Sequence, residues 1–407
     1  MIRVFTIIMS VFITIGMTAQ DSIRVSRQWL PLTAVGVTST AIGTFSRSSM
    51  DAWKVNAPER DEKKGVVNIV QYTPMLLPWI MKGIGEPTRS GWGRMATSHA
   101  IGGALMVGTV SLIKEQKDAL RPDGTDFRSF PSGHSAWAFM GATMVSRELG
   151  WRSPLYTFGA YTVATGVAMQ RVMSRRHLPS DVIAGAGIGI LTTQVGYFVG
   201  DLIFGNRQLE NSSNDISSSF TNTPAVSLEI GAYFPFGTIQ AGGVEISRGM
   251  TLDAGIKGSA PVSEHWSLGM ELALRSMPIW SDNGIERIYI STLNSIGAII
   301  STSYILPLSR YFAITADAAT GYYRKIGFKT ADESISAGSG FGIGRIAAGA
   351  ELRLDEQLSM RAGVGYEISR YKFSIDTPSE IYHTANTDKT SGTTEGLLLN
   401  LSTRVTF

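Results

Sequence analysis

The sequence predicts an α + β chain of two domains, a bundle of six helices followed by an antiparallel β-barrel of about eight strands. Three observations lead to this prediction. The chain has 407 residues, more than one hydrophobic core usually serves. Apolar residues recur with a helical period up to residue 204 and alternate with small or polar residues beyond residue 224. A stretch rich in serine and asparagine separates the two patterns.

Residues 1–20, MIRVFTIIMSVFITIGMTAQ, have the pattern of a secretory signal peptide. Arg3 precedes an apolar run from Val4 to Met17, which is short for a membrane span, and small residues follow the run. A membrane anchor is the alternative interpretation. With the signal peptide removed, the mature protein would work outside the cytoplasm.

Residues 21–204 are expected to form the helical domain. Its apolar segments are rich in Gly, Ala, Thr and Ser, and several are short for a membrane span, so a buried bundle and a membrane-associated bundle both fit. The predicted helices cover residues 31–45, 67–84, 95–113, 134–147, 154–171 and 181–204.

Residues 205–224, GNRQLENSSNDISSSFTNTP, are predicted to be a flexible linker. Beyond it, residues 225–407 contain alternating segments such as SLEIGAYF, WSLGMELAL and LSMRAGVGYEI, which are typical of strands. This alternation predicts the barrel domain.

Short turns and long polar loops alternate between these strands, as in a bacterial outer-membrane barrel. A soluble β-sandwich is the alternative. The domain resembles small outer-membrane barrel proteins, and its aromatic end at Phe407 resembles their assembly signal. The expected short turns are 307–310 and 355–357, and the expected long loops are 278–286, 328–337 and 374–393.

Charge and cysteine content exclude several functions. The formal net charge is only +3 and no long basic run is present, which argues against nucleic acid as a partner. The chain has 0 cysteines, which excludes disulfides, thiol catalysis and cysteine-ligated metals.

Three short segments of the helical domain carry the residues that suggest chemistry. One lysine and two arginines brought to one point would bind a multiply charged oxyanion, and guanidinium groups match phosphate geometry. The segments are KEQKDALRP with Lys114 and Arg121, FPSGHSAWAF with Ser132, Gly133 and His134, and RVMSRRHLPSD with Arg171, His177 and Asp181.

The two histidines fit a phosphoryl-transfer site. A helix that begins between Pro131 and Gly133 would direct backbone N–H groups toward a phosphate, and Gly133 would allow close approach. His177 would act as a nucleophile if Asp181, one helical turn away, fixed its tautomer. His134 would then serve as the general acid and base.

These segments resemble the signature of the type 2 phosphatidic acid phosphatase (PAP2) superfamily over about residues 60–204. Gln170 stands where that signature has a serine. The resemblance implies a phosphohistidine on His177, oriented by Asp181, with His134 as acid and base. It also implies a phosphate site made of Lys114, Arg121, Ser132, Gly133 and Arg171.

The resemblance implies an enzyme without metal or other cofactor that hydrolyses a lipid-linked phosphate monoester or pyrophosphate, of the phosphatidic acid, lipid A or isoprenoid type. A small phosphate ester is the alternative substrate. A vanadium-dependent haloperoxidase and a non-catalytic outer-membrane structural or binding protein are the alternatives. His99, His265 and His383 are expected to be structural.

The two domains together predict a location in the cell envelope. A linker of twenty residues reaches only about 70 Å, so we expect the barrel to lie in the outer membrane, in contact with its lipid, and the catalytic domain to lie in the periplasm. A barrel of about eight strands is too narrow for a general pore.

Overall fold

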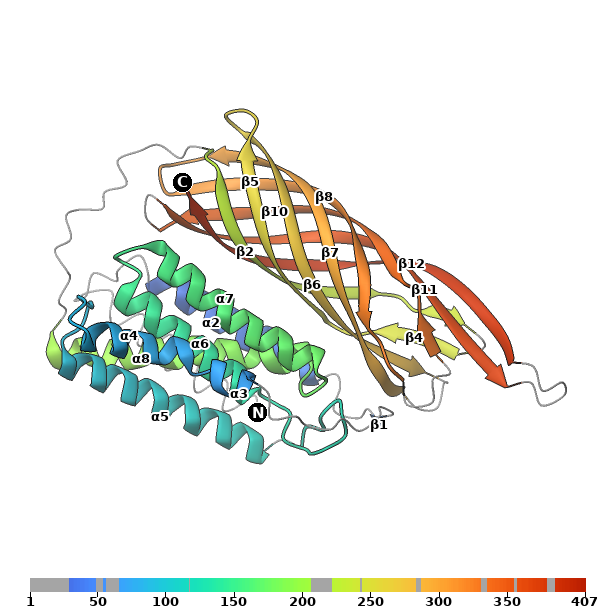
Figure 1. Ribbon diagram of the computed structural model, residues 1–407, viewed down its shortest axis with the longest axis horizontal. Coiled ribbons are helices and arrows are strands. Elements are labelled where there is room, and N and C mark those ends of the chain that lie inside the picture. Colours follow the sequence, from blue (N-terminus) through green and yellow to red (C-terminus); the bar gives the residue numbers. More distant parts are fainter. Residues whose placement is uncertain are drawn as a thin grey trace.

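The computed structural model shows a helical bundle lying along one side of a β-barrel (Figure 1). The predicted signal peptide and most of the predicted linker lie outside the residues that the structure describes. These are residues 29–48, 54–55, 66–116, 118–205, 222–241, 244–282, 287–330, 335–354, 357–378 and 385–407.

The helical half is confirmed, with seven helices in the described residues where six were predicted. The predicted helix at 67–84 is divided in two, because Pro74 lacks the N–H that would bond to the carbonyl of Val70. The helices are α2 (Trp29–Ser48), α3 (Val67–Val70), α4 (Thr73–Gly83), α5 (Trp92–Gln116), α6 (Gly133–Leu149), α7 (Pro154–Met173) and α8 (Pro179–Phe204).

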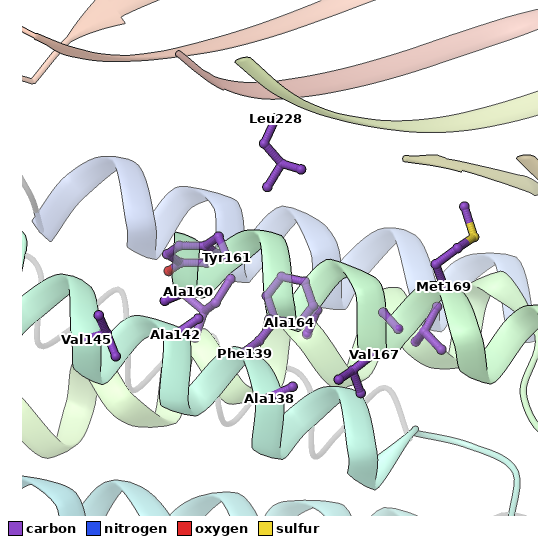
Figure 2. Close-up of a cluster of buried hydrophobic side chains, with 14 of the residues drawn as sticks. Ala138, Phe139, Ala142, Val145, Ala160, Tyr161, Ala164, Val167, Met169 and Leu228 are labelled. Atoms are coloured by element: carbon purple, nitrogen blue, oxygen red, sulfur yellow. The ribbon is translucent and has the colours of Figure 1, made fainter. Parts of the chain in front are cut away.

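α8 is the central helix of the bundle and packs against α2, α5 and α6. Among the described residues, α5 and α8 are long and apolar enough to cross a membrane, but most of α8 is buried inside the protein. The main core cluster joins α6 and α7 to the barrel, with Phe139 and Tyr161 on the bundle side and Leu228 on the barrel side (Figure 2).

Eight long strands close the barrel. Each pairs with its neighbours in antiparallel fashion in the order β7-β8-β10-β11-β12-β2-β5-β6, and β6 pairs back to β7. The long strands are β2 (Ala225–Phe236), β5 (Thr251–Pro261), β6 (Trp266–Asp282), β7 (Arg287–Pro307), β8 (Phe312–Gly327), β10 (Gly340–Arg353), β11 (Leu358–Pro378) and β12 (Ala385–Thr406). The short strands are β1 (Lys54–Val55), β3 (Ile239–Ala241), β4 (Val244–Arg248) and β9 (Ile335–Ala337).

The barrel is polar inside and apolar outside. In the lumen, the buried Arg275 bonds to Asp253 and Glu367, with N–O distances of 2.7 Å to each. On the outer wall, Met270 and Leu272 of β6 are 63% and 65% exposed. This is the distribution of a transmembrane barrel, and the closed ring excludes the β-sandwich.

Two of the predicted long loops are largely strand, so that part of the prediction was wrong. β6 and β7 pair as far as Asp282 and Arg287, and β11 and β12 pair as far as Pro378 and Ala385. Polar side chains suggested loops, but the hydrogen bonds of a hairpin join backbone groups and do not require apolar side chains.

The bundle also touches the barrel near the start of β7. β1, which follows α2 in the chain, pairs in parallel with β7 through Lys54 and Ile288. The Asn294 side chain donates from Nδ2 to the carbonyl oxygen of Met173, the last residue of α7, at 3.1 Å. These contacts lie at the end of the barrel opposite the paired residues Ala225 and Thr406.

Candidate active site

The start of α6 carries three of the predicted site residues. Ser132 is the N-cap of the helix, and its Oγ accepts from the backbone N–H of Ser135 at 3.4 Å. Gly133 is the first helical residue, and a Cβ built on it would meet nothing within 4 Å. Open space therefore lies beside the helix N-terminus and His134, where an anion could approach the backbone.

The start of α8 fixes Asp181 opposite His177. Asp181 is fully buried, and its Oδ2 accepts from the backbone N–H of Leu178 at 2.9 Å and from Ser129 Oγ at 2.5 Å. His177 Nδ1 lies 3.6 Å from the same oxygen, which is longer than a hydrogen bond but within range of a small rotation of the ring. This places Nδ1 toward the carboxylate.

Close packing of α6 on α8 brings the two histidine segments together. A Cβ at Gly185 would lie 2.3 Å from the carbonyl oxygen of Ser132, and a Cβ at Gly189 would lie 2.3 Å from that of Ala136. Only glycine fits at such distances. The backbone N–H of Ser132 also donates to the carbonyl oxygen of Asp181 at 2.9 Å, which joins the two helix starts directly.

The three predicted cations lie close enough to His134 for their charges to lower its pKa. Lys114, in the last turn of α5, donates from Nζ to the Arg128 carbonyl at 2.8 Å. Arg121 Nε donates to Asp126 Oδ1 at 2.8 Å, so a bound phosphate would share this guanidinium with a carboxylate. Arg171, in the last turn of α7, is 5% exposed.

Both histidines are neutral at physiological pH in this arrangement. Burial lowers the pKa of His177 to about 4, although the neighbouring Asp181 acts in the opposite direction. Burial, followed by the charge of Arg171, lowers the pKa of His134 to about 3. A phosphate bound among the cations would raise the pKa of His134, because a nearby negative charge favours the protonated ring.

All eight predicted site residues therefore belong to one cluster, and the positive charges of Lys114, Arg121 and Arg171 all act on His134. His99 and His265 lie elsewhere, with His99 Nε2 2.9 Å from the hydroxyl of Tyr197 and His265 stacked on Tyr304. The third histidine expected to be structural, His383, lies outside the described residues.

Three residues of the cluster were missed by sequence reasoning. The Asn68 Oδ1 lies 2.9 Å from His134 Nε2, and Ser129 bonds to Asp181. Arg47 of α2 lies with Nε 3.7 Å from Asp181 Oδ1 and donates from Nη2 to the Leu120 carbonyl at 2.9 Å. A single arginine near the end of the apolar segment 31–45 was the available signal for Arg47.

The arrangement can bind an oxyanion and present a neutral imidazole to it. With His177 Nδ1 directed at a carboxylate, Nε2 is the nitrogen that carries a free lone pair. With His134 Nε2 donating to Asn68, Nδ1 is the nitrogen that can gain or lose a proton. The site therefore pairs a nucleophile with a proton carrier, next to three cations.

Comparison with known proteins identifies the domain that carries this site. Residues 93–201 match the family model of the PAP2 superfamily and form a domain of that family. Over 138 residues the chain is 46% identical to a lipid A 1-phosphatase of Porphyromonas gingivalis. The match covers 34% of this chain and 31% of that relative, so the chain spans about a third of the relative's length.

Solved structures similar to part of the chain were also found. The outer membrane protein OprG of Pseudomonas aeruginosa is 11% identical, with a TM-score of 0.40, and the match covers 46% of this chain and 98% of OprG. A transmembrane PAP2-type phosphatidylglycerolphosphate phosphatase of Bacillus subtilis is 20% identical, with a TM-score of 0.24, covering 50% of this chain and 98% of that structure.

Proposed function

We propose that the PAP2 superfamily domain of this chain is a phosphatase that hydrolyses a lipid-linked phosphate monoester or pyrophosphate. The observation that carries the proposal is the buried pair of His177 and Asp181, 3.6 Å apart, beside the cluster of Lys114, Arg121 and Arg171. A neutral imidazole next to bound phosphate and oriented by a carboxylate is the arrangement that nucleophilic catalysis at phosphorus requires.

In the first step, Nε2 of His177 attacks phosphorus and the bond from phosphorus to the leaving oxygen breaks. His134, protonated once phosphate is bound, gives a proton to that oxygen. Asp181 stabilises the positive charge that develops on the His177 ring. The lysine and the two arginines neutralise the phosphoryl oxygens, whose charge is spread over the transition state.

In the second step, water attacks the phosphohistidine, the P–N bond breaks, and His134 takes the proton from the water. Inorganic phosphate leaves and His177 returns to its neutral form. The reaction is balanced by one water for each ester bond. We propose that it needs no metal, because protein cations stand where a metal would otherwise neutralise the phosphate.

The substrate is proposed from the relative and from the barrel. The similarity to a lipid A 1-phosphatase, 46% identical over 138 residues, supports a lipid phosphate such as lipid A. The barrel has an apolar outer wall suited to a membrane, which supports a lipid over a small soluble ester. Phosphatidic acid and isoprenoid pyrophosphate are the other candidates.

The test uses the full chain, purified in detergent with a chelator present, and measures phosphate release from lipid A, phosphatidic acid and an isoprenoid pyrophosphate. We expect release by the wild type and none by His177→Ala. His265→Ala is the matched control, because His265 lies on the barrel away from the cluster. Release that is the same in His177→Ala and the wild type would contradict the nucleophile assignment.

The periplasmic position of the catalytic domain also stays a proposal. An even strand number puts both ends of the barrel on the same side of the membrane, and in outer-membrane barrels that side is the periplasm, which supports a periplasmic catalytic domain. One observation favours the opposite side, since Asn294, which contacts Met173 of the bundle, lies toward the other end of the barrel. The orientation of the bundle beside the barrel therefore needs a direct experiment.

Because the chain has 0 cysteines, single cysteines can report the side of the membrane. Phe127, the position of Phe127→Cys, lies near the site and is 58% exposed. Val262, the position of Val262→Cys, lies in the turn between β5 and β6, on the side of the barrel where β2 begins and β12 ends, and is 65% exposed. We expect an impermeant maleimide to label both only after the outer membrane is permeabilised. Labelling of Phe127→Cys alone in intact cells would place the site on the outer face.

A further inference from the structure

A cavity of about 670 Å³ lies between the helical bundle and the barrel wall. Its bundle side is lined by residues of α2, α6, α7 and α8, and its barrel side by residues of β2, β5, β10, β11 and β12. Most of these side chains are apolar. Figure 2 shows one edge of this interface, where Leu228 points from the barrel toward the helix that carries Tyr161.

One end of the cavity comes close to the candidate phosphate site along α7 and α8. Val182 lines the cavity and directly follows Asp181 in α8. Ala168 lines it three residues before Arg171 in α7. At a rise of about 1.5 Å per residue, these positions lie within about one helical turn of the charged cluster.

From there the cavity runs along the helices, away from the charged cluster. Its lining on α8 reaches from Val182 to Ile190, and on α2 it reaches from Ile42 back to Leu32. These spans correspond to roughly 12 and 15 Å of helix. An elongated apolar space that begins beside an anion site has the shape of an acyl chain attached to a phosphorylated headgroup.

Two of the barrel residues that line the cavity have small side chains. Ala350 of β10 and Ala362 of β11 are cross-strand partners, and both line the cavity. The residues next to them in sequence, Glu351 and Arg361, form a buried ion pair inside the barrel. Because successive side chains of a strand point to opposite faces, both alanines point outward. On the same outward face of β10, Ile346 lies outside this cavity and is 64% exposed.

Both the barrel and the bundle also expose apolar side chains. Leu272 on the barrel is 65% exposed, and Leu112 and Val107 on α5 are 55% and 46% exposed. Exposed apolar side chains on the outer wall of a barrel are typical of contact with a membrane. Membrane lipid is therefore the source of apolar chains closest to this space, and its acyl chains match the cavity lining in chemistry.

We infer that the cavity between bundle and barrel holds an acyl chain of the lipid phosphate while its phosphate occupies the cluster around His177. The inference rests on the proposed phosphatase function and assigns the barrel a role beyond anchoring, because the barrel wall forms one side of the chain-binding site.

The test compares a long-chain phosphatidic acid in detergent micelles with a water-soluble phosphate ester, p-nitrophenyl phosphate. Ala350→Trp and Ala362→Trp would fill the cavity from the barrel side, away from the catalytic residues. Ile346→Trp, on the same strand as Ala350, is the matched control. Displacing about two methylenes of a chain lowers kcat/KM about tenfold. We expect that loss for the long-chain lipid in the two cavity variants alone, with hydrolysis of the soluble ester unchanged in all three.

Unchanged hydrolysis of the long-chain lipid by both cavity variants would overturn the inference, as would equal losses on both substrates in folded protein. If the wild type hydrolyses neither substrate, the proposed function fails and the cavity is tested separately. For that, wild-type protein is irradiated with a phosphatidic acid that carries a diazirine at the end of its acyl chain. Adducts on peptides that line the cavity support chain binding, and adducts confined to other surfaces contradict it.

Discussion

Replacing Asp181 with asparagine changes one carboxylate oxygen to an amide group in a side chain that is fully buried. Either orientation of the amide is unfavourable. One sets the NH2 group against the backbone N–H of Leu178, and the other sets it against the guanidinium of Arg47. The change also removes the negative charge that would stabilise a protonated His177.

Asp181→Asn should lower kcat far more than the loss of a hydrogen bond alone would. In a Ser-His-Asp triad, the same Asp-to-Asn change lowers kcat about 10⁴-fold because the imidazole takes the wrong tautomer. We expect a loss of that order in Asp181→Asn. A buried donor left facing another donor costs about 1–3 kcal/mol, so the variant should also melt at a lower temperature.

Ser129→Ala is the matched control, because it removes one hydrogen bond to Asp181 and keeps the charge. Such a bond contributes about 1 kcal/mol, so its kcat should fall by roughly tenfold or less. The assay is initial-rate phosphate release at saturating lipid, with circular dichroism to verify folding. A folded Asp181→Asn with the same kcat as Ser129→Ala would refute the orienting role of Asp181.

Three further predictions test the packing, the electrostatics and the barrel. Gly185→Ala should destabilise the helical domain by about 1–3 kcal/mol through its clash with Ser132, whereas Gly159→Ala, which meets open space, should not lower the melting temperature. In a ¹⁵N-histidine NMR titration, His177 should stay neutral down to about pH 5 and titrate near 4, because its pKa is lowered by burial; titration near 6.5 would contradict this. Since the unfolded ring binds its proton first, this group lowers the free energy of unfolding as the pH falls from 6.5 to about 4. Arg275→Met should destabilise the barrel by about 3–5 kcal/mol, because it removes a cation that neutralises the buried negative charges of Asp253 and Glu367. The measurement is the heat-modification temperature in gel electrophoresis, which should fall.

The helices and most strands could be predicted from the sequence because their side chains repeat with the period of the element. The break between α3 and α4 depends on one missing N–H at Pro74, which hydrophobic periodicity does not register. The extensions of β6, β7, β11 and β12 were missed for a related reason, since they are held by backbone pairing while their side chains are polar.

The charged residues of the candidate site were predictable because their types and spacing fit one reaction. Asn68 and Arg47 were not, because they reach the site only through packing of helices that are distant in sequence. A Cβ at Gly43 would lie 2.5 Å from the Ser180 carbonyl, and this close contact of α2 with α8 brings Arg47 to Asp181. No local pattern in the sequence encodes which glycines make such contacts.

The central claim is that His177 forms a covalent bond to phosphorus, and trapping that intermediate tests it most directly. Full-length protein is mixed with lipid phosphate, quenched in alkali, where a phosphohistidine survives, and digested for mass spectrometry. We predict a phosphoryl group on the peptide that contains His177, and its loss in His177→Ala. Continued turnover with no adduct on that peptide, or an adduct on another residue, would contradict the account.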